Sequence, residues 1–104
     1  MPTDEQTLPR PHSPYGVTKL AAEHLGRLYF KAHAIPTVGL RYFNIYGPRQ
    51  SPEGPYAAVI PLFFQACRRG EAPIINGDGE QSRDFTFVAD AVRANLLASG
   101  APDA

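Results

Sequence analysis

Proline and glycine divide this chain into short apolar segments, and this division is the feature that most constrains its fold. The 104 residues include eleven prolines and nine glycines, most of which lie between apolar stretches. Proline fixes φ and removes a backbone donor, and glycine permits turns that other residues avoid. Both residue types therefore mark the ends of elements, and we expect several short helices and strands joined by ordered turns.

Three of these segments have helical periodicity. The first begins with Ser13 as a capping residue and Pro14 in the first turn, and it ends before Pro36 because the residue preceding proline avoids helical geometry. Gly70 and Gly100 close the other two segments. The patterns predict helices over about 14–33, 59–69 and 89–99.

The remaining apolar segments are short and rich in β-branched and aromatic residues, which favour strands. They predict strands over 37–43, 73–76 and 83–88, the last two forming a pair after a turn at 77–79. Residues 44–55 hold several prolines and glycines and are expected to form a long ordered loop of the kind that carries function. This mixture predicts an α/β or α+β fold whose sheet is incomplete.

Charge and cysteine content exclude several classes of function. Ten basic and ten acidic residues balance, so nothing favours a nucleic-acid partner. No apolar run approaches the ~20 residues of a membrane helix, and the first residues lack the pattern of a secretory signal. The single cysteine, Cys67, predicts a reducing, cytoplasmic location. His12, His24 and His33 lack metal-ligand spacing, so no metal site is expected.

Tyr15 and Lys19 lie four residues apart on the first predicted helix and therefore on one face. A phenol is a poor base at neutral pH, and a nearby ammonium stabilises the phenolate. A tyrosine–lysine pair can then take a hydroxyl proton while hydride leaves the same carbon for a nicotinamide. The spacing alone is also common on exposed helices, so an ordinary surface pair stays an alternative.

The same face continues with two small residues, Ala22 and Gly26, which leave room for something to lie against the helix. An apolar stripe occupies roughly the opposite side. Its members are Val17, Leu20, Ala21, Leu25 and Leu28. This stripe expects sheet strands that the chain does not encode, so we predict exposed apolar surface and a marginally stable fold.

Three stretches in order, 13–23, 40–61 and 75–92, closely resemble the extended short-chain dehydrogenases acting on nucleotide sugars, the NAD-dependent epimerase/dehydratase family. The middle stretch looks most like the 4-epimerases of UDP-glucose and UDP-N-acetylglucosamine. The resemblance implies a single fragment, 1–104, of an α/β enzyme with a Rossmann-type doubly wound sheet. In this assignment 13–44 belong to the dinucleotide-binding domain, 45–87 to the small substrate-binding domain, and 88–104 to a helix returning to the first.

The resemblance implies a catalytic role for Tyr15 as acid/base, with Lys19 holding the nicotinamide ribose of NAD. Phe43 would lie beside the nicotinamide. Tyr15, Lys19 and Phe43 are thus the candidate cofactor-binding residues. A complete relative would oxidise the sugar at C4, rotate the keto sugar and reduce its other face.

Substrate binding is implied for residues from the loop and the later strands. Asn44 would bind the phosphate or sugar, Arg83 the diphosphate, and the others the nucleotide, Asn76 at its uracil end. The full candidate set is Asn44, Gln50, Ala58, Val59, Asn76 and Arg83. From the residues alone, Asn44 could instead cap a turn, and Arg83 could form a surface ion pair with Asp84.

The family's glycine-rich cofactor loop and catalytic serine or threonine would lie before residue 1, so the chain is expected to cover the middle third of such an enzyme. We therefore expect little or no activity from the chain alone and a homodimer for an intact parent. A nucleotide-sugar 4,6-dehydratase, which shares the tyrosine–lysine chemistry, is the enzymatic alternative. A non-catalytic truncated remnant is the other.

Overall fold

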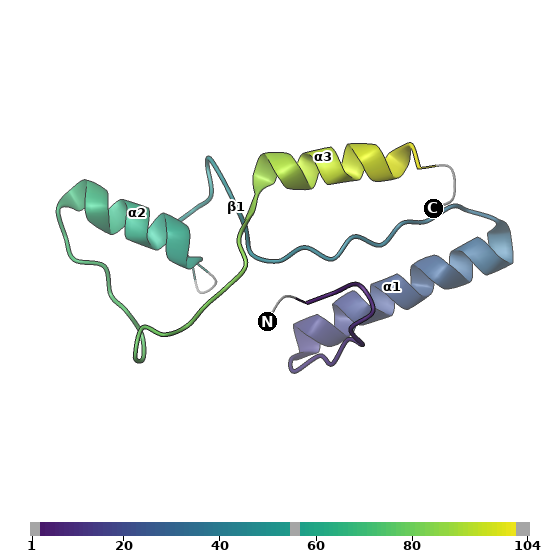
Figure 1. Ribbon diagram of the computed structural model, residues 1–104, viewed down its shortest axis with the longest axis horizontal. Coiled ribbons are helices and arrows are strands. Elements are labelled where there is room, and N and C mark those ends of the chain that lie inside the picture. Colours follow the sequence, from purple (N-terminus) through teal and green to yellow (C-terminus); the bar gives the residue numbers. More distant parts are fainter. Residues whose placement is uncertain (1–2, 55–56, 102–104) are drawn as a thin grey trace. The chain divides into compact units, whose positions relative to one another are not determined.

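The computed structural model describes residues 3–54 and 57–101, which fall into two compact units. The first unit contains residues 3–40 and 98–101, and the second contains the described residues of 41–97. The elements, in chain order, are α1 (Pro14–His33), β1 (Ile45–Tyr46), α2 (Val59–Arg69), β2 (Thr86–Phe87) and α3 (Val88–Ser99) (Figure 1).

Helix α1 dominates the first unit, and its predicted bounds are confirmed. The Gly16 N–H donates to Ser13 Oγ at 3.1 Å, which satisfies one of the unpaired donors of the first turn. At the other end Ala34 adopts φ 53°, and its N–H donates to the Phe30 carbonyl. Both ends are thus set by local contacts, which is why the sequence revealed them.

The segment after α1 runs back beside the helix. A Cβ added at Gly26 would lie 3.4 Å from Thr37 Oγ1, and one added at Gly39 would lie 3.8 Å from Glu23 Cγ. The predicted strand over 37–43 is wrong, because residues 34–43 form no strand in this chain. A strand exists only where a second backbone accepts its hydrogen bonds, and no described segment pairs with this one.

The second unit contains the two-stranded parallel sheet, in which Ile45 pairs with Thr86 and Tyr46 with Phe87. The predicted pairing of 73–76 with 83–88 is wrong as well. Residues 73–76 form no strand, and β2 covers only two residues and pairs with β1. The predicted turn does form at 77–79, where Gly77 and Gly79 have φ of 84° and 81°.

Helices α2 and α3 complete this unit. The predicted bounds of α2 are confirmed, with Gly70 at φ 68° ending it. Helix α3 begins at Val88, one residue before the prediction. Gly47, which follows β1, lies against Val88 so closely that an added Cβ would overlap its side chain.

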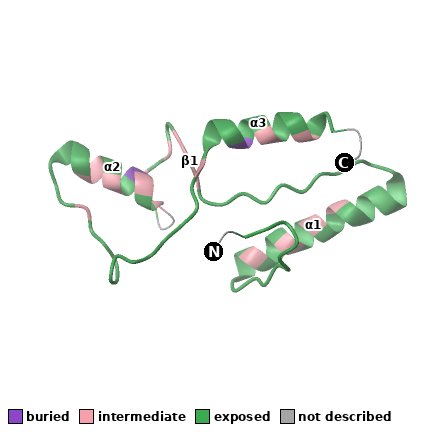
Figure 2. Cartoon of the chain, in the orientation of Figure 1, coloured by how far each residue is buried: buried purple, intermediate pink, exposed green. Residues whose placement is uncertain are grey.

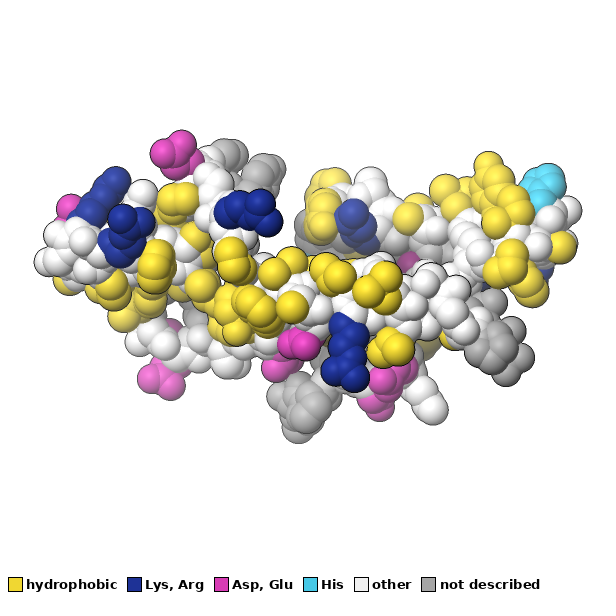
Figure 3. All heavy atoms as spheres, turned by 90° about the horizontal axis from the view of Figure 1, so that it is seen from above, with side chains coloured by type: hydrophobic (Ala, Val, Ile, Leu, Met, Phe, Trp, Pro, Cys, Tyr) yellow, Lys and Arg dark blue, Asp and Glu magenta, His cyan; other side chains and the backbone are white. Residues whose placement is uncertain are grey.

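Very little of the described chain is buried, as Figure 2 shows. Of the described residues only Pro61 on α2 and Ala91 on α3 are buried. Large apolar side chains are exposed on every helix, and they are conspicuous on the face seen in Figure 3. They include Val17, Leu25, Leu28, Tyr29 and Phe30 on α1, Leu62 and Phe64 on α2, and Leu96 and Leu97 on α3. The predicted exposure of the α1 stripe is confirmed for all its members, except that Leu20 is half-buried.

Candidate active site

The first unit brings Tyr15 and Lys19 together at the start of α1. Lys19 Nζ lies 5.2 Å from the centroid of the Tyr15 ring, so the ammonium stands over the aromatic face. Both side chains are exposed, Tyr15 to 70 %. The pair is therefore open to a ligand, and its two side chains point to the same side of the helix.

The space expected beside Gly26 for a ligand is occupied by Thr37. Thr37 lies in van der Waals contact with the position of a Cβ at Gly26. Gly26 thus serves the close approach of the segment that follows α1, whereas Ala22 remains exposed.

Asn44 connects the segment before β1 to the segment before β2. Its Nδ2 donates to the Asp84 carbonyl at 2.9 Å, and the Thr86 N–H donates to the Asn44 carbonyl at 3.3 Å. The partner is 40 residues away, so the side chain does not cap a local turn. Asn44 also has φ 21°, a left-handed value that asparagine tolerates better than most residues.

Arg83 precedes the carbonyl that holds Asn44, so the structure brings these two candidates together. The Arg83 Nη1 donates to the Ser82 carbonyl at 2.7 Å, and Arg83 forms no ion pair with Asp84 in the described chain. The guanidinium is exposed and retains donors for a ligand. Phe43, next to Asn44, is 45 % exposed.

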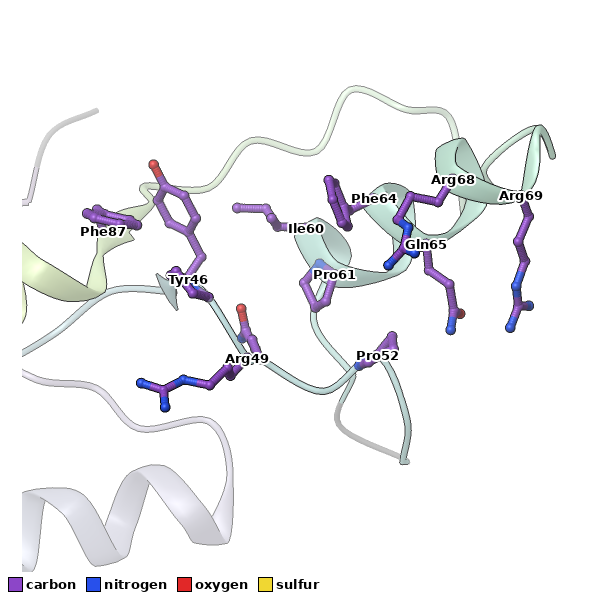
Figure 4. A pocket seen from close by; sticks show the side chains of 13 residues that line it. Tyr46, Arg49, Pro52, Ile60, Pro61, Phe64, Gln65, Arg68, Arg69 and Phe87 are labelled. Atoms are coloured by element: carbon purple, nitrogen blue, oxygen red, sulfur yellow. The ribbon is translucent and has the colours of Figure 1, made fainter.

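A cavity of about 720 Å³ lies between the loop after β1 and α2 (Figure 4), and Gln50 is one of the residues that line it. Its Nε2 donates to the Ile45 carbonyl at 3.4 Å, while its Oε1 is buried and has no partner in the part of the chain that the structure describes. A buried acceptor without a donor is costly, so this oxygen is an unsatisfied polar group at the cavity wall.

The other cavity residues were not predicted as site residues. They include aromatic rings and arginines, of which Arg49 extends away from α2 (Figure 4). The lining residues are Tyr46, Gly47, Pro48, Arg49, Gln50, Pro52, Ile60, Pro61, Phe64, Gln65, Arg68, Arg69 and Phe87. The helical spacing of Ile60, Phe64 and Arg68 was a signal that they share one face, but nothing in the sequence shows which segment faces it.

Ala58 and Val59 lie at the N-terminus of α2, outside the cavity lining. Ala58 is the capping residue and offers no side-chain oxygen, so no side chain caps this end. Asn76 lies apart in the loop before β2, where its carbonyl accepts a hydrogen bond from Gln81 Nε2 at 3.3 Å. The cavity thus brings in Gln50 alone of the predicted substrate-binding residues.

Metal ligands and membrane spans are both absent from the described ranges. Residues 3–54 and 57–101 contain no cluster of three histidine, cysteine or acidic side chains. No helix formed by these residues has the length and apolarity needed to cross a bilayer.

Comparison with known proteins gives consistent results. The profile of the NAD dependent epimerase/dehydratase family matches residues 1–104. A putative UDP-glucose 4-epimerase from Methanocaldococcus jannaschii is 44 % identical over 98 residues, which are 94 % of this chain and 32 % of that protein.

Solved structures agree. UDP-N-acetylglucosamine 4-epimerase from Methanobrevibacter ruminantium, in complex with UDP-N-acetylmuramic acid, is 44 % identical with a TM-score of 0.92. The match covers 98 % of this chain and 33 % of that one. UDP-glucuronic acid 4-epimerase from Bacillus cereus, in complex with UDP-glucuronic acid and NAD, is 42 % identical with a TM-score of 0.81, covering 96 % and 31 %.

The relatives also include a dTDP-glucose 4,6-dehydratase from Neisseria gonorrhoeae, 40 % identical over 90 residues, which are 86 % of this chain and 25 % of that protein. The chain spans about a third of the length of the first relatives that it matches. It therefore corresponds to one part of their fold, and the predicted partial Rossmann-type α/β architecture is confirmed at that level.

Proposed function

Because this chain belongs to the NAD-dependent epimerase/dehydratase family, we propose that it supplies the catalytic tyrosine and lysine of a nucleotide-sugar 4-epimerase. The proposed substrates are UDP-glucose and UDP-N-acetylglucosamine, and the proposed cofactor is NAD. The observation that carries the proposal is the Lys19 ammonium standing over the exposed Tyr15 ring.

Tyr15 is proposed to take the proton of the sugar C4 hydroxyl and to return it after the sugar has turned. The positive charge of Lys19 stabilises the phenolate that this exchange requires. The Lys19 Nζ also has donors for the hydroxyls of a ribose, and Phe43 offers an exposed aromatic face for a planar ring. NAD, when bound, would supply the redox chemistry at C4.

The proposed substrate contacts divide between charge and hydrogen bonding. Arg83 and the remaining amide hydrogen of Asn44 suit phosphate oxygens, and Asp84 links the two residues. The N-terminus of α2 at Ala58 and Val59 lacks a side-chain cap, so its amides are suited to nucleotide oxygens. Gln50, at the cavity wall, is proposed to contact the nucleotide, and Asn76 its uracil end.

Epimerisation is preferred over dehydration because the most similar 4-epimerase relatives reach 44 % identity, against 40 % and 34 % for two dehydratase relatives, although another UDP-glucose 4-epimerase reaches only 37 %. A 4,6-dehydratase is the second candidate, since its reaction begins with the same oxidation at C4. The two are separated by their products: an epimerase yields the C4 epimer, whereas a dehydratase yields a 4-keto-6-deoxy sugar.

We also propose that 13–44 belong to a dinucleotide-binding domain and 45–87 to a substrate-binding domain. Residues 88–104 would form a helix that returns to the first domain. A cytoplasmic location and a homodimer in an intact parent are further parts of the proposal.

The test is a chimera in which residues 1–104 replace the matching third of the Methanocaldococcus jannaschii relative. With NAD present we expect interconversion of UDP-glucose and UDP-galactose, or of the N-acetylated pair. Tyr15→Phe should lower kcat by about 10²–10⁴-fold, the contribution of general acid–base catalysis.

Tyr29→Phe is the matched control, because Tyr29 is an exposed tyrosine on the same helix, and it should leave turnover unchanged. Equal turnover in the Tyr15→Phe chimera would contradict the proposal. The isolated chain, which holds only part of the surface for NAD, should show no turnover above blank.

A further inference from the structure

A cluster of three polar groups connects the segment before β1 to α3 within the second unit. The Tyr42 hydroxyl donates to the Ala91 carbonyl at 3.3 Å. Asn95 Nδ2 donates to the same carbonyl at 2.8 Å and also to the Tyr42 hydroxyl. Each of the three groups therefore contacts the other two.

Tyr42, the member of this cluster that precedes β1, lies two residues before Asn44. Asn44 is itself hydrogen-bonded to Asp84 and Thr86. The chain between Tyr42 and Asn44 belongs to no strand, so no ladder sets its position. It is held by the Tyr42 cluster at one end and by the Asn44 bonds at the other. The residue proposed to face the nicotinamide, Phe43, lies between them.

Packing of the Tyr42 side chain does not by itself explain how the segment from Tyr42 to Asn44 is held in position. The ring is 40 % exposed, and Asn95 is exposed as well. The carbonyl they share belongs to Ala91, which is 5 % exposed and so gives the cluster a fixed base. The hydroxyl is therefore one of the groups that hold the segment against α3.

We propose that Tyr42 and Asn95 are positioning residues, which act through Asn44 to align the substrate's phosphate or sugar. The inference rests on the proposed substrate contact of Asn44, and it adds two residues that touch no ligand themselves. Each residue can be tested by a small change. Tyr42→Phe removes only the hydroxyl oxygen, and Asn95→Leu removes the side-chain amide with a residue that favours a helix.

The first test is amide hydrogen exchange on the full chain. The Thr86 N–H reports the position of Asn44, because it donates to the Asn44 carbonyl. Loss of one net hydrogen bond should speed Thr86 exchange by about 3–10-fold in Tyr42→Phe and in Asn95→Leu. The double variant should exchange no faster than Tyr42→Phe, because that change already removes both bonds of the hydroxyl, whereas Asn95→Leu leaves the bond from Tyr42 to the Ala91 carbonyl.

Tyr29→Phe is again the control, and it should leave Thr86 exchange unchanged. Unchanged exchange in both cluster variants would overturn the inference. Thr86 exchange at the unstructured rate in the unaltered chain would overturn it too.

The second test uses the chimera described above and separates alignment from loss of folded protein. If Tyr42 aligns Asn44, Tyr42→Phe should raise KM for the nucleotide sugar by about 3–10-fold and keep kcat within about twofold. A merely destabilised variant would lower kcat in proportion to the folded fraction and leave KM unchanged, which would refute the positioning role. Should the unaltered chimera be inactive, the proposed function fails, and Thr86 exchange alone decides this inference.

Discussion

At the scale of single residues, Asn44 joins the segment before β1 to the segment before β2 through its side-chain amide and its backbone carbonyl. Its neighbours in the sequence predicted a substrate contact, and they left a turn cap as the alternative. The structure gives its amide a partner 40 residues away, a contact that no local pattern contains. Arg83 is similar, since the absence of an ion pair with Asp84 depends on where the Ser82 carbonyl lies. The sequence thus identified the candidate residues, but it could not identify their hydrogen-bond partners.

The left-handed backbone of Asn44 gives a prediction at this scale. Asn44→Ala should destabilise the chimera by about 1–3 kcal/mol, because it removes the bond to Asp84 and leaves a Cβ residue at positive φ. Asn44→Gly loses the same bond but tolerates this φ, so it should destabilise less. Urea denaturation of both variants measures the difference. An alanine variant as stable as the glycine variant would show that φ 21° carries no strain.

At the scale of elements, helix bounds were predictable, whereas strands were predicted only in part: β2 lies within the predicted strand 83–88, but 37–43 and 73–76 form none. Ser13, Gly70 and the residues before Pro36 mark helix ends through contacts within a few residues, and the bounds of α1 and α2 match the prediction. A strand depends on its partner. Segments 37–43 and 73–76 have strand-forming residues but no pairing backbone in this chain, and the two-residue strands form instead where Ile45 and Thr86 meet. The cavity on α2 was also unpredictable, because it depends on which distant segment faces the helix.

The contact between β1 and α3 predicts a difference between two glycines. An added Cβ at Gly47 would overlap the Val88 side chain, whereas at Gly39 it would make an ordinary contact of 3.8 Å with Glu23 Cγ. Gly47→Ala should therefore cost about 1–3 kcal/mol of unfolding free energy and disturb the start of α3. Gly39→Ala is the matched control and should cost well under half of that. Equal denaturation midpoints in the chimera would show that the Gly47 loop shifts freely.

At the scale of the whole molecule, the chain exposes more apolar surface than a self-sufficient domain does. Among the described residues only Pro61 and Ala91 are buried, while Leu25, Leu28 and many other large apolar side chains are open to solvent. Large exposed apolar patches mark surfaces that bind other proteins or promote association. The chain also matches only about a third of its relatives' length. This agrees with the exposure of apolar side chains on its helices.

This exposure predicts the solution behaviour of the isolated chain. It should bind a hydrophobic dye, associate in sedimentation experiments and lose structure gradually on heating. Leu28→Glu should reduce association, because it places a charge on the α1 stripe, whereas Leu8→Glu, which is exposed outside any helix, should not. A sharp thermal transition from a monomer that binds no dye would contradict this expectation.

The close approach of Thr37 to Gly26 limits what can lie along α1. From Pro14 to Ala22 the face bearing Tyr15 and Lys19 is open, a length of about 12 Å at the helical rise. Beyond Ala22 the Thr37 side chain occupies the space beside the helix at Gly26. The dinucleotide of the proposed function is longer than that, so most of its proposed contacts would lie outside this helix.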